Sequence, residues 1–190
     1  PDLTNTSKIS VVYLGNSMLE RLKTTGRTTQ LANLTTSWNA GCGGDKNENV
    51  LYRLDLGLYS ILKQYHASET AEGRPGIRVW VLKSGTNNLH AKKGFREQDV
   101  ESWRVLVESC LKIAPGSTVL ACDVFFRKDV DDGLVERGNQ MLKGVVEEFG
   151  KQEEGERVKW VEARHLVTKD MLVDRVHLNE EGYRVFDETL

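Results

Sequence analysis

A serine that follows a glycine and an asparagine is the first residue of this chain that could act as a nucleophile. Ser17 stands directly after Gly15 and Asn16, where an apolar segment gives way to a helical pattern. At a strand-to-helix turn the backbone N–H of such a serine belongs to a helix N-terminus, which suits a nucleophile whose oxyanion is held by backbone donors. A serine that only caps the helix would explain the same residues. The turn differs from the Gly-x-Ser-x-Gly elbow because Leu19 occupies the second glycine position.

An aspartate and a histidine late in the sequence could supply the base for that serine. Asp174 precedes His177 by three residues. In a tight turn, a carboxylate at this spacing can accept a hydrogen bond from one ring nitrogen and fix the tautomer, which leaves the other nitrogen to take the serine proton. Asp-x-x-His pairs also occur by chance on protein surfaces. The combination predicts a Ser17, His177 and Asp174 triad.

Two further segments could stabilise negative charge on a substrate oxygen. The Gly43-Gly44 pair lets the backbone approach a ligand closely and aim an N–H group at it. The side-chain amide of Asn87 is a second donor. Ordinary turns explain each segment equally well. A nucleotide-binding loop at Gly41 to Gly44 is less favoured, because the next apolar strand ends in Lys83-Ser84 rather than in an acidic residue that could bind a ribose.

Metal or cofactor chemistry has no support in the sequence. The remaining histidines, His66, His90 and His165, lack metal-ligand spacing, and no phosphate-binding glycine motif is present. We therefore expect an enzyme without cofactor or metal. Three cysteines cannot all pair with one another, which favours free thiols and a cytoplasmic location. Secretion is the alternative if a signal segment was removed upstream of Pro1.

The elements that must position these residues alternate between strand and helix patterns. Strands are predicted from short β-branched apolar runs at 9–14, 35–39, 77–82, 118–121 and 158–161. Helices are predicted at 17–23, from Asp45 as a cap through 50–62, and at 100–111, 134–149 and 179–190. Strands joined by helices form a parallel sheet covered on both faces, so the fold class is a three-layer α/β/α sandwich with about five strands.

In such a sheet the functional loops gather at the carboxyl ends of the strands. The segments containing Ser17, Gly44 and Asn87 each follow one of the first three predicted strands. We therefore expect all three at one edge of the sheet.

Composition restricts the partners. The chain has 190 residues and a formal net charge of −2, and no run of Lys and Arg is longer than a pair. Nucleic acid is therefore not an expected partner. No apolar run reaches the roughly 18 residues of a membrane-spanning helix. Because no linker or repeat interrupts the pattern, we expect a single domain over residues 1–190, which leaves a homodimer open.

These blocks resemble the SGNH (GDSL-type) hydrolases, which are named after a serine, a glycine, an asparagine and a histidine in separate blocks. The resemblance extends from strand one to the last helix, and it is strongest to the branch of the platelet-activating-factor acetylhydrolase catalytic subunits. The matching blocks are Tyr13-Leu14-Gly15-Asn16-Ser17-Met18, Asn39-Ala40-Gly41-Cys42-Gly43-Gly44-Asp45, Gly85-Thr86-Asn87-Asn88 and Asp174-Arg175-Val176-His177-Leu178. One departure is Asn16, where the family usually has an aspartate.

The resemblance implies a flavodoxin-like fold and an esterase that acts on small-molecule esters, with a preference for short, acetyl-type acyl groups. It implies that the Ser17 N–H, the Gly44 N–H and the Asn87 side chain form the oxyanion hole. It also implies that Met18, Thr86 and Val176 line the acyl pocket. Two other functions remain: a lysophospholipase or thioesterase for longer acyl chains, and a catalytically silent binding module on the same fold.

Overall fold

Five short apolar segments form one parallel sheet in the computed structural model, which describes residues 8–151 and 155–190. The strand order is β2-β1-β3-β4-β5. The strands are β1 Val11–Gly15, β2 Ser37–Gly41, β3 Val79–Lys83, β4 Thr118–Cys122 and β5 Val158–Val161. All five strands end at the same edge of the sheet, and this edge carries the candidate residues that follow β1, β2 and β3.

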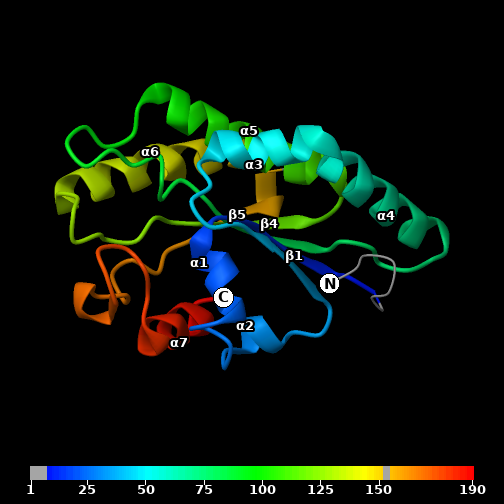
Figure 1. Cartoon of the computed structure of the whole chain (residues 1–190). Helices are drawn as coiled ribbons and strands as arrows, with labels where there is room; N and C mark the ends of the chain where they lie inside the picture. The colour runs from blue at the N-terminus through cyan, green and yellow to red at the C-terminus, as the bar shows by residue number, and fades with distance from the viewer. Residues whose placement is uncertain (1–7, 152–154) are drawn as a thin grey trace.

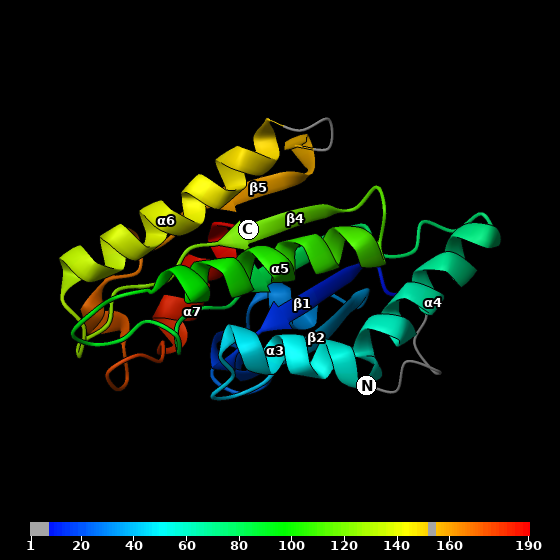
Figure 2. The ribbon, with the colours of Figure 1, turned by 90° about the horizontal axis from the view of Figure 1, so that it is seen from above.

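Helices cover both faces of the sheet. Helices α3 to α6 lie on one face, and α1, α2 and α7 lie on the other (Figure 1). Seen from above in Figure 2, α5 and α6 lie over the sheet and run roughly along its strands, α5 beside β4 and α6 beside β5. The α-helices are α1 Ser17–Glu20, α2 Gln30–Asn33, α3 Asn47–Arg53, α4 Tyr59–Ala71, α5 Glu97–Ile113, α6 Asp132–Gly150 and α7 Glu180–Glu188. This confirms the predicted three-layer α/β/α class.

Each face of the sheet has its own hydrophobic core. The larger core contains Trp80 of β3 and Trp103 of α5, both fully buried under the α3 to α6 layer. The smaller core packs Tyr183 and Phe186 of α7 against α1 and the sheet. The sheet is therefore buried on both sides, as its apolar strands require.

Several element boundaries differ from the sequence prediction, and three of the differences lie near the candidate residues. Strand β2 begins and ends two residues later than expected, because its pairing with β1 continues to Gly41. The helix that starts at Ser17 is α-helical only to Glu20 and continues as a 3₁₀ turn over Arg21–Lys23. Asp45 does not cap α3: Lys46 occupies the N-cap position, and the Asp45 carboxylate binds Arg53 instead.

The predicted helix at 50–62 is interrupted. The chain bends at Gly57, whose φ is +121°, within a π-type segment over Leu54–Leu58 that joins α3 to α4. A side chain at Gly57 would be strained at this φ value.

Two glycines allow backbone segments to approach closely at the strand ends. A Cβ atom on Gly15 would overlap the carbonyl oxygen of Lys83, and one on Gly41 would overlap the backbone of α1 at Glu20. Glycine is therefore required at both positions for steric reasons. The close approach at Gly41 brings the end of β2 against α1, which begins at Ser17.

Candidate active site

Ser17 is the first residue of α1 and lies just beyond the end of β1. Asn16 is the N-cap: its backbone is extended, and its side-chain Oδ1 accepts a hydrogen bond from the Met18 N–H at 3.0 Å. Among the described residues, the Ser17 N–H has no hydrogen-bond partner. The asparagine in place of an aspartate therefore retains the cap, but its Nδ2 atom is buried without a partner in the described structure.

Asp174 and His177 lie in a tight turn before α7 that brings the imidazole to Ser17. One carboxylate oxygen of Asp174 accepts the backbone N–H groups of Val176 and His177, both at 2.8 Å. Its other oxygen lies 2.7 Å from His177 Nδ1. His177 Nε2 lies 3.1 Å from the Ser17 Oγ. The aspartate therefore holds both the turn and the ring.

These contacts determine the charge of Asp174. Partial burial by itself would raise the pKa of the carboxyl group. The hydrogen bonds from the His177 ring and from the backbone N–H groups of His177 and Val176 outweigh that effect and hold the pKa well below its ordinary value. The carboxylate is therefore charged at neutral pH, as needed to stabilise an imidazolium.

Two more candidate donors lie beside Ser17. Gly44 has a φ of +80°, and its N–H has no hydrogen-bond partner among the described residues. The Asn87 amide donates to the carbonyl oxygen of Asp45 at 2.8 Å. Because an amide nitrogen carries two hydrogens, one remains for a ligand. This bond also joins the loop after β3 to the loop that contains Gly44.

Sequence reasoning missed the polar side chains that hold these loops together. Arg53 donates to the carbonyl oxygens of Gly15 and Ala40 and to the Asp45 carboxylate, so it links the ends of β1 and β2 to the Gly44 loop. Sequence spacing offers no signal for such contacts.

A buried pair of asparagines holds the next two loops. The Asn47 N–H donates to the Asn88 side chain at 2.9 Å, and the Asn47 side chain accepts from Ser84 at 2.7 Å. Asn88 in turn donates to the buried carboxylate of Asp99 at 3.1 Å. Because buried polar groups need partners, these contacts specify one arrangement of the loops.

A cavity of about 430 Å³ opens over Ser17. Eight residues line it: Ser17, Gly44, Asn87, Arg127, Asp174, Arg175, Val176 and His177. The structure thus brings together the five residues predicted for the triad and the oxyanion hole, together with Val176. The two arginines were not predicted, because nothing in the sequence marks them.

The structure does not place the other predicted pocket residues on this cavity. Met18 packs into the smaller core, since residues on one side of α1 must cover the sheet. Thr86 is buried, and its carbonyl oxygen accepts a hydrogen bond from Arg127. Phe125, in the loop after β4, also lies in that core, where its ring meets Phe186 edge to face.

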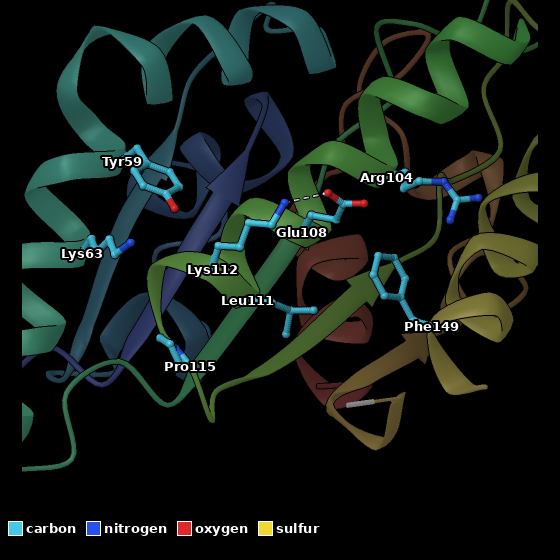
Figure 3. Close-up of a pocket in the computed structure, with 8 residues that line it drawn as sticks. All are labelled: Tyr59, Lys63, Arg104, Glu108, Leu111, Lys112, Pro115 and Phe149. Atoms are coloured by element: carbon cyan, nitrogen blue, oxygen red, sulfur yellow. Dashed lines mark hydrogen bonds and ion pairs between the residues drawn. The ribbon is translucent and has the colours of Figure 1, made fainter. Parts of the chain in front are cut away.

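A larger cavity of about 690 Å³ lies elsewhere, between α4, α5 and the end of α6 (Figure 3). Its wall includes Tyr59, Lys63, Phe149 and an ion pair between Glu108 and Lys112. None of its lining residues is a serine, cysteine or histidine. The cavity at Ser17 is therefore the better candidate site.

A metal-binding cluster and a membrane-spanning helix are both absent from the described residues, 8–151 and 155–190. These residues contain no group of three or more His, Cys, Asp and Glu side chains placed to hold a metal ion. No helix among them is both long and apolar enough to cross a membrane.

The family of the chain follows from comparison with known proteins. The model of the GDSL-like lipase/acylhydrolase family matches residues 14–185. The chain belongs to this family, which confirms the resemblance to SGNH (GDSL-type) hydrolases and makes the protein a carboxylic ester hydrolase. A search of curated protein sequences gave no match.

Solved structures of low sequence identity share the fold. A member of the lipolytic G-D-S-L family from Veillonella parvula is 17% identical with a TM-score of 0.65, and covers 95% of this chain and 94% of its own. The psychrotrophic esterase EstA from Pseudoalteromonas is 12% identical with a TM-score of 0.66, at 96% and 94% coverage. The acetyl xylan esterase AlAXEase is 17% identical with a TM-score of 0.62, at 95% and 97% coverage.

Proposed function

We propose that this protein is a serine esterase that hydrolyses short-chain, principally acetyl, esters with Ser17 as nucleophile. The main support for this proposal is the unbroken series of contacts from Asp174 through His177 to Ser17. The Asp174 carboxylate lies 2.7 Å from His177 Nδ1, and His177 Nε2 lies 3.1 Å from the Ser17 hydroxyl oxygen. Both distances suit proton transfer between a nucleophile, a base and the group that orients the base.

The reaction then follows from this geometry. His177 Nε2 takes the proton of Ser17 as its oxygen attacks the ester carbonyl carbon, and the C=O electron pair moves to the oxygen. The resulting oxyanion accepts from the Ser17 N–H, the Gly44 N–H and the free N–H of Asn87. The imidazolium, stabilised by Asp174, gives its proton to the departing alcohol as the C–O bond breaks. A water molecule, deprotonated by His177, then attacks the acyl carbon. The acid is released as the C–O bond to Ser17 breaks and His177 returns the proton to the Ser17 oxygen.

The preference for a short acyl group rests on the cavity wall. Val176 is the one aliphatic side chain among its eight lining residues, and the others are polar, charged or glycine. A methylene group gains about 0.8 kcal/mol only if an apolar surface covers it. Here a long acyl chain would remain against polar groups or water. The fold relatives named as an esterase and as an acetyl xylan esterase agree with this proposal.

Labelling with a fluorophosphonate tests the nucleophile. The Pseudoalteromonas esterase was solved in a form inhibited by monoethylphosphonate, so the chemistry is accessible to this fold. We expect one adduct, on the peptide that contains Ser17, and parallel loss of p-nitrophenyl acetate hydrolysis. The Ser17→Ala variant should neither react nor turn over. An adduct on another serine of an active protein would refute the assignment, and an inactive, unlabelled wild type would favour the silent binding module.

A series of p-nitrophenyl esters tests the acyl preference. We expect kcat/KM to fall from acetyl to butyryl to octanoyl, because Val176 alone offers an apolar contact. A maximum at octanoyl or longer would instead indicate a lysophospholipase or thioesterase.

A further inference from the structure

Two arginines on the wall of the cavity have no role in the proposed hydrolysis. Arg127 comes from the loop after β4, and Arg175 lies between Asp174 and Val176. The remaining lining residue outside the triad and the oxyanion donors is Val176. The part of the site that is free to contact the rest of a substrate is therefore dominated by guanidinium groups.

Arg127 is held in a fixed position. Its Nε and Nη2 atoms donate to the two carboxylate oxygens of Asp129 at 2.8 and 2.7 Å, and its Nη1 donates to the Thr86 carbonyl oxygen at 2.8 Å. The side chain is only 13% exposed. Since a guanidinium has five N–H groups, two remain after these three bonds. The group is thus a preoriented donor on the cavity wall.

Arg175 forms an ion pair with the same carboxylate. Its Nε lies 3.6 Å from Asp129 Oδ2, and its side chain is 73% exposed. Asp129 is charged, because the hydrogen bonds from Arg127 hold its pKa below the ordinary value. One carboxylate therefore faces two guanidinium groups, and it is not itself among the residues that line the cavity.

The one acidic residue on the cavity wall does not satisfy these donors. The Asp174 oxygens already accept the His177 ring and two backbone N–H groups. The groups left to meet a ligand are N–H donors of Arg127 and Arg175, which is the geometry that recognises carboxylate or phosphate.

We infer that Arg127 and Arg175 bind an anionic group, carboxylate or phosphate, on the alcohol part of the ester substrate. The inference rests on the proposed serine esterase function, in which the acyl part is a short uncharged group. The anion would be held before and after the acyl group is transferred to Ser17. It would therefore contribute mainly to binding rather than to the chemical step.

Matched acetate esters test this inference. Methyl 4-acetoxybenzoate is neutral, 4-acetoxybenzoate carries a carboxylate, and 4-acetoxyphenyl phosphate carries a phosphate on the same ring. The measured quantity is the ratio of kcat/KM for each anionic ester to that for the neutral ester. Comparing this ratio between variants removes differences in leaving-group chemistry.

The test variant is Arg175→Gln, which removes the exposed guanidinium. Its control is Arg78→Gln, which removes the same charge from an exposed position before β3, at the opposite edge of the sheet. We expect Arg175→Gln to lower the ratio about fivefold for at least one anion, and Arg78→Gln to leave it unchanged. A decrease for one anion but not the other identifies which of the two the site takes.

The Arg127→Gln variant distinguishes binding of an anion by Arg127 from structural support of the loop that contains Thr86. If Arg127 acted only through its bond to Thr86, beside Asn87, the variant would lower kcat equally for neutral and anionic esters. We expect in addition a rise in KM confined to the anionic esters.

Two outcomes would overturn the inference while leaving the esterase proposal intact. In the first, the neutral ester is hydrolysed in a manner that requires Ser17, but the ratio is the same in Arg175→Gln and in wild type. In the second, Arg78→Gln lowers the ratio as much as Arg175→Gln. Hydrolysis that persists in Ser17→Ala, or a wild type inactive on all three esters, would instead refute the proposed function itself.

Discussion

The Asp174 carboxylate holds a turn and an imidazole at once, and this double role makes its protonation state matter for folding. Its pKa lies below the ordinary value of 3.8. A group whose pKa is lower in the folded state stabilises the fold above its unfolded-state pKa, and that stabilisation is lost as pH falls through the folded-state pKa.

A first prediction follows for Asp174→Asn. The variant keeps an oxygen for the backbone N–H groups but loses the charge, so the wild type should be the more stable protein at pH 7. The difference in the free energy of unfolding should shrink as pH falls below about 4. Urea unfolding of both proteins at pH 7, 5 and 3 measures it. A difference that grows towards pH 3 would contradict the assigned pKa shift.

A second prediction concerns Asn87, whose amide has one hydrogen bound to Asp45 and one free. Asn87→Ala should lower kcat by about 10²–10³ with little change in KM, because the missing donor serves the oxyanion more than the bound ester. Steady-state kinetics with p-nitrophenyl acetate decide the matter. A change confined to KM would assign Asn87 to substrate binding.

At the residue scale, the blocks recognised in the sequence were enough to predict which residues lie together at one edge of the sheet. It placed Ser17, Gly44 and Asn87 after successive strands, and the structure brings them to one cavity. It could not find Arg127, because the contact of that side chain with Thr86 depends on loops far apart in the chain. Met18 was misplaced because α1 turns that side chain into the core.

At the scale of elements, the short helix α1 depends on its cap. It spans Ser17–Glu20, too short to be stable without tertiary contacts, and Asn16 provides its N-terminal hydrogen bond. The position of the Ser17 N–H is therefore tied to the side chain of Asn16.

A third prediction tests this dependence with two matched variants. Asn16→Ala removes the side chain that accepts a hydrogen bond from the backbone N–H two residues later, at the start of α1. Asp131→Ala removes the same kind of N-cap hydrogen bond from α6. Each should cost about 1 kcal/mol of unfolding free energy. Only Asn16→Ala should also lower kcat, since it alone loosens the Ser17 N–H. Equal kcat in both variants would show that the cap has no part in catalysis.

The ends of an element could be predicted where the hydrophobic pattern of the sequence stops at the same residue as the backbone hydrogen bonds of the element. Strand β5 has the predicted bounds, Val158–Val161. The bend at Gly57 was not found, because the apolar spacing from α3 into α4 continues through it. Strand β2 lies two residues later than predicted, because Gly41 still pairs with Gly15 of β1.

At the scale of the whole molecule, the two cores lie on opposite faces of one sheet. We propose that the chain folds as one domain, as its length and uninterrupted pattern predict. In that case neither helical layer can open alone without exposing the apolar strands beneath it.

A fourth prediction uses two buried thiols as reporters of the two layers. Cys110 lies in the larger core and Cys122 in the smaller one, and burial raises the pKa of both thiols, that of Cys122 to about 12. Under rising urea, both should become reactive to a thiol reagent over the same concentration range. Partly exposed Cys42 should react without urea. Separate transitions for Cys110 and Cys122 would indicate two independently folding parts.

The contact between Ser17 and His177 joins residues 160 positions apart. Under the proposed function this distance has a consequence for biosynthesis. During translation the nucleophile, its cap and the oxyanion donors are synthesised well before the base, which lies in the last turn before α7. The growing chain therefore carries an unactivated serine until the segment that contains His177 has been synthesised. Hydrolytic activity begins only when that segment docks beside α1.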